Sequence, residues 1–153
     1  MLHGPRTRPL FDAEIAVGAP VDAGETPLGR RRYIPITGGT FRGEGLSGIV
    51  LPGGADWQLI RGDGVAEISA RYALETAEGG RLTVNSNGFR HGPPEVMAAL
   101  ASGAEVDSAS YYFRTAISFE PGAESLAWLG RLVCFAIGAR RADRVELSFH
   151  ALL

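Results

Sequence analysis

Apolar and polar residues alternate along much of this 153-residue chain. The segment 11–17 has an apolar residue at every second position, and the segments 66–74 and 145–151 repeat this pattern. Because successive side chains of a strand point to opposite faces, the alternation is typical of strands with one buried face. The sequence predicts strands over residues 11–17, 30–36, 40–51, 57–61, 66–75, 81–87, 111–119, 126–137 and 145–153.

Tight turns and one short helix interrupt these strands. The sequences Gly62-Asp63-Gly64 and Glu78-Gly79-Gly80 are typical of hairpin turns. Pro93-Pro94 is favourable at a helix start, and residues 96–100 carry apolar side chains at helical spacing. Ser102-Gly103 would end this helix, so we predict a single helix near residues 94–101.

Repeated strands and glycine turns predict an all-β fold. We expect one domain over residues 1–153, in which residues 1–9 form a flexible N-terminal arm. Eight or more antiparallel strands in a small domain leave no exposed edge when the sheet closes on itself. We therefore predict a closed or nearly closed antiparallel β-barrel with one short α-helix, and a two-sheet sandwich is the alternative.

Composition narrows the classes of function. Hydrophobic residues make up 45% of the chain and charged residues 21%, as in soluble globular proteins. A net charge of −2 provides no attraction for nucleic acid or an anionic membrane. The basic start of the chain lacks the apolar stretch of a signal peptide, and no apolar run approaches the ~20 residues of a membrane helix. Cys134 is the only cysteine, which excludes an internal disulfide and suits a cytoplasmic location.

The basic residues exclude several kinds of chemistry. All 15 of them are arginine, so no lysine can form a Schiff base, hold pyridoxal phosphate or serve a P-loop. The three histidines, His3, His91 and His150, lack the short spacing of metal ligands. We therefore expect no cofactor and no metal.

Polar side chains concentrate in two short segments. Gln58, Asn85 and Asn87 are the only carboxamides of the chain. Asp56 and Gln58 should share one face of a strand, which in a ligand-binding barrel is the interior. Alternatively, Asp56 pairs with backbone donors in a turn at Gly53-Gly54. Asparagine is unfavourable in strands, so its occurrence twice in three residues indicates either a ligand site or a bend.

Arginine and histidine side chains extend the candidate site. Gly88 would permit a turn before Arg90 and His91, and His91 is either a general acid or base near neutral pH or a loop anchor. Arginine forks bind carboxylates or phenolates, with cross-strand pairing to glutamate as the alternative. The arginines that lie beside aromatic residues in predicted strands are Arg71, Arg90 and Arg114.

Six short motifs follow one another along the chain. They are Gly29-Arg30-Arg31-Arg32, Ile36-Thr37-Gly38-Gly39-Thr40-Phe41, Leu51-Pro52-Gly53-Gly54-Ala55-Asp56-Trp57-Gln58, Ala70-Arg71-Tyr72, Arg90-His91-Gly92-Pro93-Pro94 and Tyr111-Tyr112-Phe113-Arg114. From about Leu10 to the C-terminus, the chain resembles the bacterial and fungal domain of unknown function 3237, also called uncharacterised protein family 311. The resemblance implies a compact lipocalin-like (calycin-like) β-barrel, and it implies no established reaction.

We expect the barrel to bind a small, partly apolar organic molecule. As an enzyme it would perform cofactor-free proton transfer such as isomerisation, cyclisation or elimination, with Asp56 and His91 as the candidate catalytic residues. The candidate ligand contacts are Gln58, Arg71, Asn87, Arg90, Tyr112 and Arg114. If the two polar segments line one pocket, Asp56, Asn87 and either Arg90 or His91 should converge.

Two alternatives remain open from the sequence. The protein is either a binding protein without catalysis or a structural subunit with an interface at Trp128 and the predicted strand 126–137. We expect a homodimer or a higher homo-oligomer, because one short helix cannot cover the apolar residues outside a barrel. No nucleic-acid or membrane partner is expected, since Arg31 would point away from Arg30 and Arg32 in a strand.

Overall fold

The computed structural model describes residues 2–153, which form ten strands, one α-helix and two 3-10 helices. The strands are β1 (Thr7–Val17), β2 (Val21–Thr26), β3 (Gly29–Gly43), β4 (Leu46–Val50), β5 (Ala55–Ile60), β6 (Ala66–Thr76), β7 (Arg81–His91), β8 (Tyr112–Pro121), β9 (Cys134–Arg140) and β10 (Arg144–Leu152). The helix α1 spans Pro94–Ala101, which confirms the predicted helix, and the 3-10 helices η1 and η2 span Ser108–Ser110 and Glu124–Arg131.

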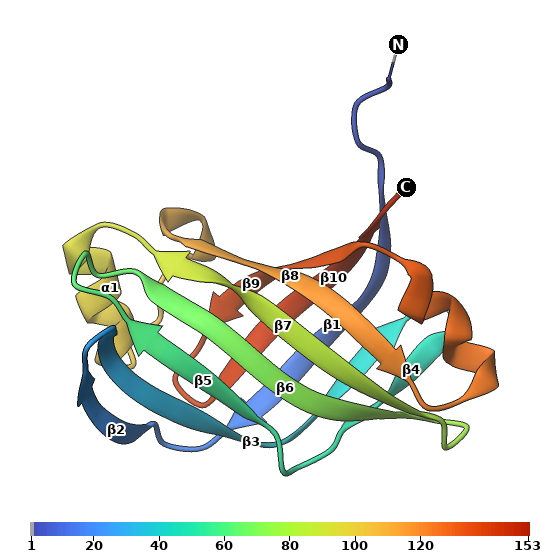
Figure 1. The fold of residues 1–153 in the computed structure, drawn as a ribbon, viewed down its shortest axis with the longest axis horizontal. Helices are drawn as coiled ribbons and strands as arrows, with labels where there is room; N and C mark the ends of the chain where they lie inside the picture. The colour runs from blue at the N-terminus through green and yellow to red at the C-terminus, as the bar shows by residue number, and fades with distance from the viewer. Residues whose placement is uncertain (1) are drawn as a thin grey trace.

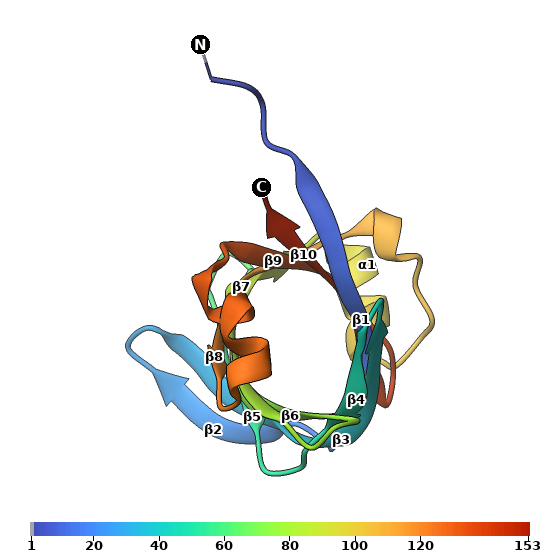
Figure 2. The same ribbon diagram turned by 90° about the vertical axis from the view of Figure 1, so that its right-hand side faces the viewer.

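The strands close into an antiparallel β-barrel, which confirms the predicted fold class (Figures 1 and 2). The wall follows the order β1-β10-β9-β8-β7-β6-β4-β3, and pairing of β1 with β3 closes it. β4 and β5 follow one another in the same position of the wall, because each pairs with both β3 and β6. β2 pairs with β3 and lies outside this circuit.

Several predicted boundaries were wrong. β1 begins at Thr7, so the end of the predicted arm belongs to the wall. The predicted strand 126–137 begins only at Cys134, because the preceding segment forms η2. Trp128 therefore lies on a helix rather than on an interface strand. The predicted strand 40–51 is divided by a turn at Gly45, whose φ of 68° favours glycine.

One half of the barrel interior is an apolar core. Phe11 is the centre of an aromatic cluster, and its ring stacks on Phe149 at 4.4 Å and lies 5.1 Å from Phe41. At this end η2 lies at one side of the barrel opening, as Figure 2 shows, and its Leu126 and Leu129 are buried. The aromatic cluster and η2 thus occupy the same end of the barrel.

The opposite end has a different character. α1 lies there, at the far side of the barrel from η2 in Figure 1, and none of its residues is fully buried. The interior strand positions at this end include arginine, aspartate, glutamine and tyrosine, and they form the candidate site described below. Among residues 2–153, no helix has the length and apolar character needed to cross a membrane.

Gly88 illustrates how closely the wall strands approach. It lies within β7 rather than at a turn, so the predicted turn was wrong and the strand continues to His91. A Cβ atom at Gly88 would overlap the carbonyl oxygen of Arg114 and crowd the Cα of Thr115 on β8.

We expect Gly88→Ala to reduce the free energy of unfolding by about 2–3 kcal/mol, because the two backbones would have to separate. Gly62→Ala is the matched control, since an added Cβ there has no neighbour within 4 Å, and it should change stability by less than about 0.5 kcal/mol. Urea unfolding of both variants measures the difference, and equal losses would contradict the close approach.

Candidate functional site

Six side chains form an interior polar cluster at the α1 end of the barrel. The cluster consists of Arg32, Asp56, Gln58, Tyr72, Arg90 and Arg140. Strand pairing sets part of it: Asp56 and Gln58 lie two residues apart on β5, and Gln58 lies opposite Arg32 on β3. Gln58 is only 1% exposed, so the polar face of β5 is the interior face.

A directional chain of hydrogen bonds joins three members of the cluster. The Nε of Arg32 donates to the Oε1 of Gln58 at 2.8 Å, and the Nε2 of Gln58 donates to the Oδ2 of Asp56 at 2.7 Å. The backbone N–H of Ser69 donates to the other oxygen, Oδ1 of Asp56, at 3.1 Å. Because arginine only donates and carboxylate only accepts, the orientation of the Gln58 amide is determined.

Burial shifts the pKa values of several side chains in the cluster. Burial raises the pKa of Asp56, although the hydrogen bonds from Gln58 and Ser69 and the charges of Arg90 and Arg32 oppose the shift. Burial lowers the pKa of Arg90 to about 10, and the charge of Arg32 acts in the same direction. Burial likewise lowers the pKa of Arg140. At neutral pH the Arg90 guanidinium therefore remains charged.

Two buried polar atoms of the cluster have no hydrogen-bond partner among residues 2–153. They are the Oη of Tyr72 and the Nε of Arg90. Burial raises the pKa of Tyr72, and the charge of Asp56 adds to this effect, so the phenol is neutral and can donate. The guanidinium of Arg90 lies 5.4 Å from the centre of the Phe113 ring. Both residues line the same unfilled space.

That space is a small interior cavity of about 40 Å³. Its polar lining includes Asp56, Gln58, Tyr72, Arg90 and Arg140. The apolar lining consists mainly of Ile15, Val17, Ile34, Ile36, Ile68, Val145 and Leu147. A volume of this size holds about three water molecules. The lining of the cavity therefore combines charged and aliphatic side chains.

The remaining predicted site residues lie on the outer face of the barrel. Because β7 continues through Gly88, the burial of Arg90 inside requires Asn87 and His91 to point outward, and both are exposed. The predicted convergence of Asp56 with Asn87 was therefore wrong, whereas Asp56 and Arg90 do line one cavity. Asn85 lies two residues before Asn87 on the same strand, so its side chain also points outward.

An outer cluster accounts for most of the other candidates. The His91 ring stacks on Tyr112 at 4.9 Å, and the guanidinium of Arg114 lies 5.4 Å from the same tyrosine ring. Arg71 is exposed and lies 3.9 Å from a carboxylate oxygen of Glu120, so the glutamate-pairing alternative describes it better. None of these four side chains lines the interior cavity.

Three members of the interior cluster were missing from the sequence prediction. Arg32 is in phase with the buried Ile34 and Ile36, and Tyr72 is in phase with the buried Leu74. The same period of two along β9 places Arg140 inside. The alternation that predicted the strands could have identified all three.

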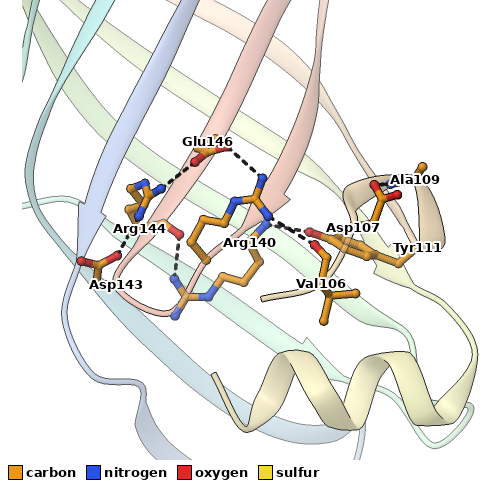
Figure 3. Close-up of polar contacts among 9 residues, drawn as sticks. Val106, Asp107, Ala109, Tyr111, Arg140, Asp143, Arg144 and Glu146 are labelled. Carbon is orange, nitrogen blue, oxygen red and sulfur yellow. Dashed lines mark hydrogen bonds and ion pairs between the residues drawn. The ribbon is translucent and has the colours of Figure 1, made fainter. Parts of the chain in front are cut away.

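A connecting segment covers the barrel beside Arg140, as Figure 3 shows. The backbone N–H of Arg140 donates to the Oη of Tyr111 at 2.9 Å, and Arg141 donates to the carbonyl oxygen of Val106 at 3.2 Å. Glu146 accepts from Arg141 and Arg144 at 3.2 and 3.0 Å, and these hydrogen bonds lower its pKa. The segment between α1 and β8 is thus attached to the β9–β10 hairpin.

Metal binding finds no support in the side-chain arrangement. Within residues 2–153, no group of three or more His, Cys, Asp and Glu side chains is close enough to hold a metal ion.

The fold and the cluster define a closed β-barrel with a polar interior at one end. The chain belongs to the family described as protein of unknown function (DUF3237), whose sequence profile matches residues 5–152. It is 42% identical over 147 residues to a UPF0311 protein of Rhodopseudomonas palustris, covering 96% of each chain. A UPF0311 protein of Clostridium acetobutylicum is 37% identical and covers 94% of this chain and 91% of the relative. The resemblance inferred from the six motifs is confirmed.

Solved structures show the same architecture. A conserved protein of unknown function from Rhodopseudomonas palustris superposes with a TM-score of 0.96 at 41% identity, covering 99% of this chain and 100% of the other. A β-barrel-like protein from Acinetobacter baumannii has a TM-score of 0.87 at 35% identity, covering 100% and 99%. An enzyme from Penicillium herquei has a TM-score of 0.75 at 17% identity, covering 100% and 98%, and shares the fold.

Proposed function

We propose that the protein binds a small, partly apolar organic molecule in the interior cavity. The observation that carries this proposal is the pair of unpartnered buried donors, Tyr72 Oη and Arg90 Nε, in residues that line a cavity together with aliphatic side chains. A buried polar group without a partner costs about 1–3 kcal/mol. A bound molecule would supply the missing acceptor and cover the aliphatic side chains.

The size of the cavity limits what can bind without movement. Space for about three waters suits the polar head of a ligand but not a whole organic molecule. Arg140 lines the cavity, is only partly buried and has a long side chain. A shift of this side chain would enlarge the cavity for the remainder of the ligand.

Asp56 is the group that we propose to transfer a proton if the ligand is a substrate. Its raised pKa brings it closer to the range of a general acid or base, and Gln58 and Ser69 hold both of its oxygens in place. Arg90 would stabilise negative charge that develops on an oxygen of the substrate. His91 has no such role in this proposal, because its ring stacks on Tyr112 outside the barrel.

A fragment screen by methyl NMR tests the proposal. Bound molecules should shift the methyl signals of Ile34, Ile68 and Val145, which line the cavity. Tyr72→Phe should weaken this binding about tenfold, because it removes one of the two unpartnered donors of residues that line the cavity. Tyr33→Phe is the matched control, since this tyrosine packs on the exposed Trp57 and does not line the cavity, and it should bind as the wild type does.

Fragments that shift only methyl signals of the outer face would refute the interior site. Unchanged affinity in Tyr72→Phe would remove Tyr72 from it. Native mass spectrometry of the purified protein, compared with Tyr72→Phe, would show whether a molecule that co-purifies depends on the same hydroxyl group.

The structural-subunit alternative predicted an interface strand that contains Trp128. In the structure Trp128 lies on η2 instead, and the Arg8 guanidinium is 5.6 Å from the centre of the Trp128 ring. Self-association stays a prediction, which light scattering at micromolar concentration would test.

A further inference from the structure

We propose that the molecule bound in the cavity is an organic anion whose charged head is a carboxylate held by Arg90. This inference rests on the proposed function, because it uses the same cavity, and it adds the chemical class of the ligand. It is based on the net charge of the interior polar cluster, the unpartnered Nε of Arg90 and the side chains that line the cavity.

The cluster contains more positive than negative charge. Three guanidinium groups, those of Arg32, Arg90 and Arg140, act on one carboxylate, that of Asp56. Asp143 also acts on Arg140, but its carboxylate pairs with Arg144 at 3.2 Å. Among residues 2–153, no carboxylate oxygen lies within 4 Å of a nitrogen of the three cluster arginines.

The carboxylate of Asp56 is occupied by other donors. Its two oxygens accept from Gln58 and from the backbone of Ser69, and the Arg32 guanidinium is directed at the neutral oxygen of Gln58. The cluster is therefore built so that its single acid does not form an ion pair with its arginines. A second anion is needed to balance the charge.

Arg90 is the residue of the cluster that we propose to bind this anion, because it is buried and lacks a hydrogen-bond partner at Nε. It is 6% exposed, and the Nε of its guanidinium has no hydrogen-bond partner among residues 2–153. A buried charge without a partner is strongly unfavourable, and a carboxylate is the group whose two oxygens match the arginine fork. Tyr72 also lines the cavity, and its unpartnered hydroxyl group is a further donor beside the Arg90 guanidinium.

The lining of the cavity favours an organic carboxylate over a small inorganic oxyanion, because the carboxylate is attached to a carbon skeleton. The aliphatic residues that complete the lining, such as Ile34 and Ile68, suit the carbon chain or ring attached to the head.

Acetate and acetamide are a matched pair of probes, since they are nearly identical in shape and differ in charge. At pH 7.5 and constant ionic strength, acetate should shift the NMR signals of the Arg90 side-chain N–H groups and of the cavity methyls. With four non-hydrogen atoms, its dissociation constant can be no tighter than tens of micromolar. We expect millimolar binding of acetate and at least tenfold weaker binding of acetamide.

Arg90→Met removes the proposed anion-binding group and keeps much of its volume. This variant should bind acetate at least tenfold more weakly, and its melting temperature without ligand should equal or exceed that of the wild type, because an unpaired buried charge is gone. Arg114→Met is the matched control, since Arg114 also lies over an aromatic ring but outside the barrel, and it should keep the acetate response. Arg90→Gln provides a second variant if Arg90→Met does not fold.

The outcomes separate this inference from the proposed function. Equal binding of acetate and acetamide at the cavity, or cavity binding by neutral fragments only, would overturn the anion assignment and leave the binding function intact. Tighter binding of phosphate than of acetate would overturn the carboxylate head. If neither the fragments nor the pair of acetate and acetamide shifts the NMR signals of the residues that line the cavity, both proposals fail.

Discussion

Phe149→Ala should reduce the free energy of unfolding by about 4 kcal/mol, which is among the largest effects of a single core truncation. Phe149 is fully buried, and its ring stacks on Phe11 at 4.4 Å and lies 6.0 Å from Phe119. Removing the ring leaves a cavity that three neighbouring strands cannot close, because their backbones are held by pairing on both sides. Urea unfolding at 25 °C measures the loss.

Phe89→Ala is the control for this truncation. Phe89 is 44% exposed on the outer face of β7, so its removal should cost less than about 1 kcal/mol. Losses of similar size in the two variants would contradict the assignment of the aromatic cluster as the core.

Gln58→Glu should destabilise the protein by about 3 kcal/mol at pH 7 and have little effect near pH 4. The substitution puts a second carboxylate where the Gln58 amide now donates to Asp56 at 2.7 Å in a buried site. Two adjacent carboxylates cannot both ionise, so one pKa rises well above its unfolded value. A raised pKa means that the stability of the protonated pair is present at low pH and is lost as the pH rises through the folded pKa.

The double substitution Asp56→Asn with Gln58→Glu should recover most of this loss. The amide at position 56 would then donate to the carboxylate at position 58, while its oxygen still accepts from the Ser69 backbone. Arg32 would donate to a carboxylate instead of an amide oxygen. The chain of hydrogen bonds is restored, but the residue at position 56 now donates to the residue at position 58. The cluster again contains one carboxylate.

This double variant distinguishes structure from function at one site. Unfolding measured from pH 4 to pH 8 should show the pH-dependent loss in Gln58→Glu and its absence in the double variant. The proton-transfer role proposed for Asp56 should remain lost, because the carboxylate has moved by two residues. A double variant as unstable as Gln58→Glu would refute the directional chain.

The fold could be predicted because alternation, glycine turns and one proline-initiated helix agree with one another. Boundaries were missed where a local signal was ambiguous. The apolar residues of the segment 126–132 fit a strand pattern, yet Leu126 and Leu129 are three residues apart and lie on the buried side of η2. A 3-10 helix of this length is uncommon, so periodicity alone favours the strand.

The candidate site was predicted in part, and the reason lies in a single glycine. Along β7 the apolar Leu82 and Val84 identify the interior parity, which continues to Arg90 and excludes Asn87. Interpreting Gly88 as a turn broke that parity and placed both side chains in one pocket. In the structure the glycine allows close approach of β8 instead, and the strand runs on unbroken.

The cluster arginines illustrate a different limit. The alternation along β3 and β9 places Arg32 and Arg140 on the interior face, although arginine is mostly an exposed residue type. Only barrel closure shows that their positions converge. The hydrogen bond from Arg32 to Gln58 across two strands is likewise a product of register, which the sequence does not specify.

The separation of the aromatic core near η2 from the polar cluster near α1 has a consequence for evolution and engineering. Substitutions in the cluster leave the packing of Phe11 on Phe149 unchanged, so they should cost less stability than truncation of these phenylalanines. A library that varies Arg32, Tyr72, Arg90 and Arg140 while conserving the phenylalanines should therefore yield mostly folded barrels with altered ligand preference.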